Sequence, residues 1–343
     1  MDIEDEWENF LSSDNDTRDE TTYTKEIKPE SEIPKCTSLY ISTKTNIAYF
    51  NTLIDLKEIF WKINVMDYYE NSDGVIKKQM KFNSLTKGEY DEIENYYENE
   101  TKHKTCDIIT HIETTSLKTE VYKDVRKISI GISKKDILTY RMKKKSAFYN
   151  CFVVILRIWN SVENIFKEVH MKIFNTGKIE IPGIQDDDIF IKSIDYMKKV
   201  LSEYYCDIDY KKDDIETVLI NSNFSCGYLI NREKLFDLLI NKYKIQSLYD
   251  PCSYPGVQSK YIINNGEKTI DLSFMIFRTG SVLIVGKCMK ENLVEVYEFL
   301  KKIFIDEYMN IYQHDSNLEE SRPTKIKRPP KQRKKVIFVT TGT

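Results

Sequence analysis

The chain has 343 residues, of which 41% are hydrophobic and 31% charged, with a formal net charge of −3. This apolar content suffices for a buried core and excludes a wholly disordered chain. The seven cysteines are odd in number and form no Cys-x-x-Cys pair, which indicates neither a zinc site nor a secreted disulfide framework, so a reducing, intracellular location is expected.

The two ends of the chain differ sharply in charge. Residues 1–35 carry twelve acidic and four basic residues, whereas residues 322–335 carry eight basic residues and no acidic one. We therefore expect an acidic disordered tail over 1–35 and a basic, mostly disordered tail over 313–343. No stretch approaches 18 uninterrupted apolar residues and the N-terminal end is acidic, so neither a membrane span nor a signal peptide is expected.

Between the ends, periodic patterns predict strands followed by helices. Residues 150–158 have the composition of a strand, and residues 168–174 alternate apolar and polar side chains as a half-buried strand does. The following triplet, 175–177, ends in glycine and predicts a tight turn. Apolar residues at helical spacing over 194–204 then predict an amphipathic helix.

The sequence contains an internal repeat. The line of residues around Phe174 and Gly177 recurs 103 residues later around Phe277 and Gly280, and a second amphipathic pattern follows this copy as well. Such register indicates that one structural unit was used twice.

A second offset locates extra residues in the first half. Residues 56–60 match 232–236, which lie 176 residues later, so the first half holds 73 residues more than the second. The polar stretch 91–105 is expected to be an excursion over the surface. The predicted domains are a first repeat over 36–205, with an insertion at about 69–146, and a second repeat over 206–312.

No catalytic or metal-binding motif is present. The chain has only four histidines, and it lacks His-Glu-x-x-His, a phosphate-binding glycine loop and Gly-x-Ser-x-Gly. Asp186, Asp187 and Asp188 directly precede a predicted helix, where aspartates cap free amides, so capping is favoured over metal binding. Neither an enzyme nor a protein with a cofactor or metal is expected.

Two segments carry family-like motifs. The second half contains Tyr249-Asp-Pro-Cys-Ser-Tyr254-Pro-Gly, then Met275-Ile-Phe277-Arg-Thr-Gly and Val285-Gly. These resemble the Tyr-Glu-Pro-Glu-Leu-Phe-Pro-Gly motif, the Leu-Ile-Phe-x-Ser-Gly-Lys hairpin and the Thr-Gly of the TATA-box-binding protein family. The phrase Phe-Asn-Thr-Gly-Lys-Ile-x-Ile-Pro-Gly at 174–183 is similar to divergent members found in nucleocytoplasmic large DNA viruses. The resemblance covers roughly residues 36–68 and 147–308.

The resemblance implies an α+β fold. It would be a pseudo-two-fold saddle built from two repeats, in which a curved antiparallel sheet carries helices on its convex face. The concave face would bind the DNA minor groove and insert aromatic wedges between base pairs, a mode of binding for which this family is the standard example.

Four aromatic wedges are implied, two in each half. The residue that lies 103 positions before Tyr254 is Cys151, and of the two nearby aromatic residues, Phe148 and Phe152, the second is predicted to be the fourth wedge. The alternative is that these aromatics are ordinary sheet or core residues, which is the commoner fate of a phenylalanine on a strand. The predicted wedges are Phe174, Phe277, Tyr254 and Phe152.

Polar and basic contacts are implied as well. An asparagine amide can donate to the base-edge acceptors of A·T pairs. Glu180 lies at a groove position, where its carboxylate must turn aside, pair with a basic side chain or weaken DNA binding. Polar strand residues are otherwise simply solvated. The implied groove contacts are Asn221, Asn223, Thr43 and Thr45. The implied phosphate contacts are Arg157, Lys178 and Lys260.

The implied function is that of a non-enzymatic transcription initiation factor. It would bind and bend A/T-rich promoter DNA in the minor groove and help to recruit a transcription factor IIB-like protein and RNA polymerase, acting as a monomer in the host cytoplasm, virion or nucleus. The IIB-like partner would dock on the loop that contains Tyr249, Asp250 and Cys252. Two alternatives stay open: a protein adaptor with weak or no specific DNA binding, and a DNA-processing enzyme with a saddle subdomain.

Overall fold

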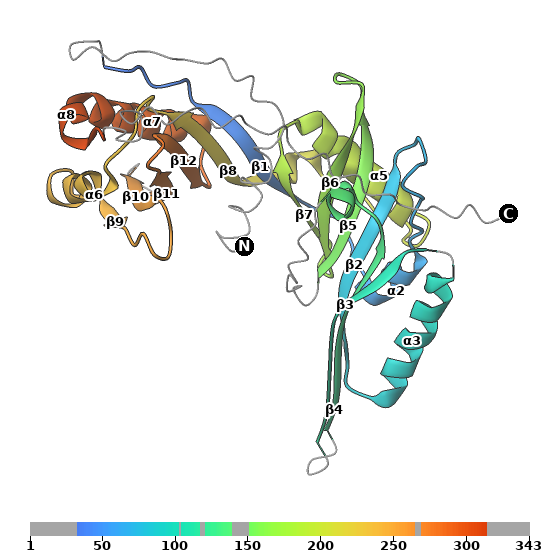
Figure 1. Ribbon diagram of the computed structural model, residues 1–343. Coiled ribbons are helices and arrows are strands. Elements are labelled where there is room, and N and C mark those ends of the chain that lie inside the picture. The colour runs from blue at the N-terminus through green and yellow to red at the C-terminus, as the bar shows by residue number, and fades with distance from the viewer. Residues whose placement is uncertain (1–32, 103, 117–120, 139–150, 265–268, 314–343) are drawn as a thin grey trace, which may run out of the picture. The chain divides into compact units, whose positions relative to one another are not determined.

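The structure is a computed structural model and describes residues 33–102, 104–116, 121–138, 151–264 and 269–313 (Figure 1). Phe148 and most of both predicted tails lie outside the described residues. The strands are β1 Tyr40–Tyr49, β2 Gly74–Ser84, β3 Cys106–Ser116, β4 Val121–Gly131, β5 Cys151–Asn160, β6 Ile165–Phe174, β7 Lys178–Ile184, β8 Glu216–Ser225, β9 Gln246–Leu248, β10 Val257–Asn264, β11 Thr269–Ile276 and β12 Ser281–Gly286. The helices are α2 Leu56–Lys62, α3 Lys87–Thr101, α4 Lys134–Leu138, α5 Asp187–Leu201, α6 Arg232–Asn241, α7 Lys290–Asp306 and α8 Tyr308–Ile311, with a short 3₁₀ helix at Lys212–Asp214.

The described strands form one antiparallel sheet in which each half follows the same order. The sheet runs β3-β4-β2-β5-β6-β7-β1-β8-β12-β11-β10-β9. When β3 and β4 are left out, each half has five strands, and outward from the central pair β1 and β8 these are its first, fifth, fourth, third and second strand. This duplicated order confirms the α+β fold built from two repeats.

The backbone reproduces both sequence offsets. The amide of Phe50 donates to the carbonyl of Gly177 at 2.9 Å, and 176 residues later Cys226 donates to Gly280 at 2.9 Å. Gly177 and Gly280 have φ of 80° and 82°, a left-handed conformation that glycine adopts without strain. A Cβ at Gly280 would also lie 2.3 Å from the carbonyl oxygen of Tyr228. These glycines therefore fix both the turn and its contact with the residues that follow the first strand of the repeat.

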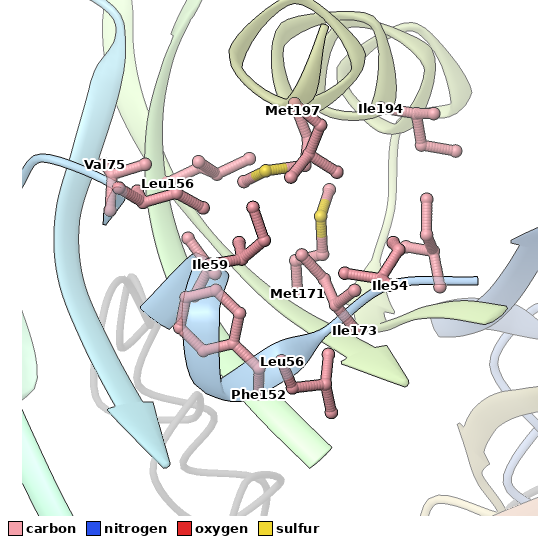
Figure 2. Close-up of a cluster of buried hydrophobic side chains, with 14 of the residues drawn as sticks. Ile54, Leu56, Ile59, Val75, Phe152, Leu156, Met171, Ile173, Ile194 and Met197 are labelled. Carbon is pink, nitrogen blue, oxygen red and sulfur yellow. The ribbon is translucent and has the colours of Figure 1, made fainter. Parts of the chain in front are cut away.

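Helices cover one face of the sheet in each half. Asp186 caps α5 by accepting from the amide of Asp188 at 2.9 Å, which confirms the predicted capping role. In Figure 2, Ile194 and Met197 of this helix lie above Met171 of β6 in the core of the first half. Full burial of one such side chain contributes roughly 1.5–3 kcal/mol. Helices α6, α7 and α8 form the corresponding core of the second half.

Added elements extend the sheet of the first half. Between β2 and β5 the chain forms α3, β3, β4 and α4, and β3 and β4 continue the sheet beyond β2. Most of the polar stretch 91–105 forms helix α3, whose N-terminus is capped by Thr86. Because β2 pairs with β5 as the second strand of its repeat should, we propose that the insertion begins after Ser84.

A buried arginine attaches α3 to the extended sheet. Arg126 of β4 is 1% exposed, and its Nε donates to Asp124 Oδ1 at 2.7 Å. Its Nη1 pairs with Glu94 of α3, and its guanidinium lies 4.1 Å from the ring centroid of Tyr90. The added elements are thus held by charge as well as by apolar packing.

Candidate nucleic-acid interface

The face of each half opposite its helices is called the reverse face here. Side chains alternate between the two faces of a strand. On β8, Ile220 and Phe224 belong to the core beneath the helices, so Asn221 and Asn223 point to the reverse face. The Asn221 amide donates to Thr43 Oγ1 of β1 at 3.0 Å, so Thr43 and Asn221 lie together, with Asn223 on the same face two residues further along β8.

Apolar side chains lie beside Asn221 and Asn223 on the reverse face of the second half. In the sheet register Asn223 lies opposite Leu283, which lies opposite Met275, and Asn221 lies opposite Val285. Leu283 and Met275 are only 8% and 4% exposed. The reverse face here combines amide donors with closely packed apolar groups.

Two predicted wedge residues of the second half lie in contact. The ring centroids of Tyr254 and Phe277 are 6.0 Å apart at an interplanar angle of 55°. A Cβ at Gly256 would lie 2.8 Å from Cε1 of Phe277, so glycine leaves room for the pair. Burial raises the pKa of Tyr254 to about 12.

The first half carries ions where the second is apolar. Phe174 occupies the same step before its turn as Phe277, and Lys178 Nζ lies 5.3 Å from its ring centroid. Glu180 pairs with Lys172 Nζ at 2.8 Å and with Lys178 Nζ at 3.7 Å. Glu180 therefore pairs with basic side chains, which is one of the three alternatives predicted for it.

Phe152 is not a wedge in this structure. It is 0% exposed and lies in the core of the first half (Figure 2). Its ring packs edge-on against that of Phe60 of α2, with the centroids 5.5 Å apart. The residue facing the reverse side is its neighbour Cys151, which lies opposite Phe174. The prediction failed because one step along a strand moves a side chain to the other face. The alternative position, Phe148, lies outside the described residues.

Two further predicted contact residues, Arg157 and Thr45, have buried side chains. Arg157 points to the reverse face but is 7% exposed, donates to the carbonyl of Tyr68 and lies 4.9 Å from the ring of Phe166. It therefore does not reach a phosphate in this conformation. Thr45 is 2% exposed and lies opposite Leu219, so its hydroxyl is not at the surface either. Lys260, by contrast, is exposed on β10.

The predicted partner loop is exposed and internally braced. Asp250 accepts from the amide of Cys252 at 3.0 Å and from the hydroxyl of Ser253, and this hydroxyl lowers the pKa of Asp250. Arg232 of α6 lies 5.4 Å from the ring centroid of Tyr249. The loop can thus present a carboxylate in a fixed position.

Residues 133–138 form a segment that lies over the reverse face of the first half, and no motif in the sequence predicts this position. The Asp136 carboxylate accepts from Lys77 Nζ of β2 at 2.6 Å, and the amide of Lys134 donates to Glu168 of β6 at 2.8 Å. Burial raises the pKa of Glu168, whereas bonds from Lys77 and Ser133 outweigh burial and lower that of Asp136. This segment covers part of the first half but has no counterpart in the second repeat.

We expect Asp136→Asn to loosen this segment. Losing a charge-assisted contact should speed hydrogen exchange at the amides of Ser133 and Lys134 by about 10-fold, equivalent to roughly 1.4 kcal/mol. Exchange mass spectrometry or NMR would measure this rate. Lys135→Gln, at an exposed position of the same segment, is the matched control. Equal exchange in both variants would show that Asp136 does not hold the segment.

The described residues offer little for other kinds of site. Among them, no group of three or more His, Cys, Asp and Glu side chains is arranged to hold a metal ion. Within the same part of the chain, every helix is too short or too polar to cross a membrane.

Comparisons with known proteins complete the picture. The duplicated sheet, backed by helices and bearing an aromatic before each turn glycine, defines a two-repeat protein with one amphipathic reverse face. No protein-family model matches the chain. It is 27% identical over 203 residues to the TATA-box-binding protein-like of Acanthamoeba polyphaga mimivirus, covering 51% of this chain and 53% of that protein. It is 29% identical over 133 residues to the TATA-box-binding protein of Sulfolobus acidocaldarius, covering 38% and 59%.

The chain is thus similar to TATA-box-binding proteins and to a viral TATA-box-binding-protein-like protein. It spans between half and three fifths of the length of these curated relatives. Among solved structures, Methanococcus jannaschii TBP aligns with a TM-score of 0.40 at 14% identity, covering 79% of this chain and 99% of that one.

Proposed function

We propose that this chain is a non-enzymatic transcription initiation factor that binds A/T-rich promoter DNA in the minor groove and bends it. The observation that carries the proposal concerns the second half. Its reverse face presents Asn221 and Asn223, and the same half also holds the Tyr254–Phe277 ring pair. Aromatic rings can unstack a base step, and amides can donate to the acceptors of A·T pairs. The names of the relatives support the same role.

Recruitment of other factors belongs to the same proposal. The braced loop with Asp250 and the exposed Cys252 would dock a transcription factor IIB-like protein, which in turn would help to bring RNA polymerase to the promoter. The protein would act inside the host cell, in the cytoplasm or nucleus, or be carried in the virion.

A second candidate is an adaptor without specific DNA binding. The covered part of the first half, with Asp136 paired to Lys77 and Glu180 paired to Lys172, favours it, because these groups reduce the area and the free positive charge that a duplex could meet. The two candidates differ in whether the protein binds DNA at all.

Mobility-shift and fluorescence bending assays at low salt separate these candidates. The unaltered protein should bind and bend an A/T-rich duplex, and Phe277→Ala should weaken binding by about 10- to 100-fold, or roughly 1.4–2.7 kcal/mol, and abolish most of the bend. Tyr69→Ala, which removes an exposed aromatic on the loop between α2 and β2, is the control and should bind normally. If the unaltered protein neither binds nor bends the duplex, the adaptor is the better description.

A further inference from the structure

Equivalent positions of the two repeats carry opposite chemistry on the reverse face. In the first half Lys172 lies directly across from Glu180 on neighbouring strands. The cross-strand pair at the equivalent positions, 103 residues later, is Met275 and Leu283. The cation that completes the first pair, Lys178, corresponds to Ser281. An ionic cluster in one half thus replaces an apolar pair in the other.

The ionic cluster is tightly organised. Glu180 Oε1 accepts from Lys172 at 2.8 Å, and Oε2 lies 3.7 Å from Lys178. The Glu180 side chain is 11% exposed, and those of Lys172 and Lys178 are 21% and 32% exposed. A carboxylate has more acceptor sites than these two cations occupy, and a lysine ammonium on its flexible stem can turn to a nearby phosphate.

The two chemistries suit different base pairs. In the minor groove an A·T pair presents only acceptors, whereas a G·C pair adds the N2 amino donor of guanine. The apolar pair Met275 and Leu283 offers that amino group no acceptor, so a G·C pair there would bury an unsatisfied donor. Glu180 does offer an acceptor, provided that Lys172 and Lys178 shift toward the phosphates.

Building on the proposed function, we infer that Glu180 is a specificity-determining residue that lets the first half accept a G·C pair while the second half requires A·T. The preferred element is then asymmetric, and a duplex with one G·C pair is bound in the orientation that brings this pair to Glu180. Lys172, which lies 2.8 Å from Glu180, positions the carboxylate, and Lys178, at 3.7 Å, supplies a phosphate contact.

Three duplexes of equal length test this inference with the full chain. One is uniformly A/T, one has a single G·C pair in one half of the element, and one has a G·C pair in each half. A mismatched pair typically costs about 1–3 kcal/mol, or roughly 10-fold in affinity at 1.4 kcal/mol. The unaltered protein should lose at most about 2-fold on the second duplex, because it can choose its orientation, and about 10-fold on the third.

The double variant Lys172→Met/Glu180→Leu copies the second half and leaves the net charge unchanged. It should already lose about 10-fold on the duplex with a single G·C pair. The matched control, Lys178→Ser, should weaken binding to all three duplexes equally and reduce the salt slope by about 1. Circular dichroism would confirm that each variant is folded.

Two results overturn the inference. If the unaltered protein and the double variant lose the same factor on the duplex with a single G·C pair, Glu180 does not determine specificity. If the unaltered protein binds none of the duplexes, the proposed function falls and the inference falls with it. Normal binding by the double variant to the A/T duplex distinguishes the first result from a general loss of binding.

Discussion

Replacing Phe152 with alanine should lower the free energy of unfolding by about 3–5 kcal/mol. Its ring is 0% exposed and lies in the core of the first half, edge-on to Phe60, so truncation removes buried apolar surface and leaves a cavity. The neighbouring core side chains are anchored to strands and cannot collapse fully into that space. Urea denaturation followed by circular dichroism would measure the loss.

Phe277→Ala is the matched control for Phe152. Phe277 is half-buried on the reverse face and does not belong to the core beneath the helices, so its truncation should cost about 1 kcal/mol. Truncating Phe152 should thus affect mainly the stability, whereas truncating Phe277 should affect mainly the binding of DNA. Equal losses of stability in both variants would contradict the assignment of Phe152 to the core and Phe277 to the reverse face.

Arg126→Met should destabilise the added elements of the first half by about 3–5 kcal/mol, the usual effect of removing one partner from a buried ion pair. The Asp124 carboxylate is 0% exposed and would lose the guanidinium that now lies at 2.7 Å. Helix α3 would lose the contact that Glu94 makes with the same group. Hydrogen exchange of β4 and α3, together with thermal unfolding, would locate and measure the change.

Lys123→Met provides the control for Arg126, because Lys123 lies on the same strand and is exposed. It should change stability by less than about 0.5 kcal/mol. The double variant Asp124→Asn/Arg126→Met should recover part of the loss, since it removes the buried carboxylate charge together with the guanidinium. A loss below about 1 kcal/mol in Arg126→Met would indicate that the ion pair contributes little.

The repeat could be predicted from the sequence because it constrains the backbone. Gly177 and Gly280 occupy turns that demand a left-handed residue, and each turn accepts or donates the same hydrogen bonds as its copy. Asp186 could be predicted to cap α5 because capping depends on local geometry alone. Features that depend on local backbone geometry, and that occur in both repeats, can be predicted from a single sequence.

The remaining site features depend on contacts that no second copy reveals. The position 103 residues before Tyr254 is Cys151, which does face the reverse side, but the expectation of an aromatic there shifted the prediction to Phe152. Arg157 has the predicted strand position, yet Tyr68 and Phe166 enclose it. The segment 133–138 belongs to the insertion, so no repeat could indicate its position on the sheet.

The central pairing of β1 with β8 has a consequence for how the chain acquires its fold during synthesis. Of the described strands, β1 is the first to leave the ribosome, but its two neighbours, β7 and β8, lie far downstream. Such distant pairings form slowly, because the loop between them must be closed before any contact rewards it. Until β8 emerges, β1 is an unpaired edge onto which another nascent chain could add a strand. The first repeat can pair β1 with its own β7, but β1 keeps an open edge until β8 has been synthesised, so the seam between the repeats closes only after the whole first repeat has emerged.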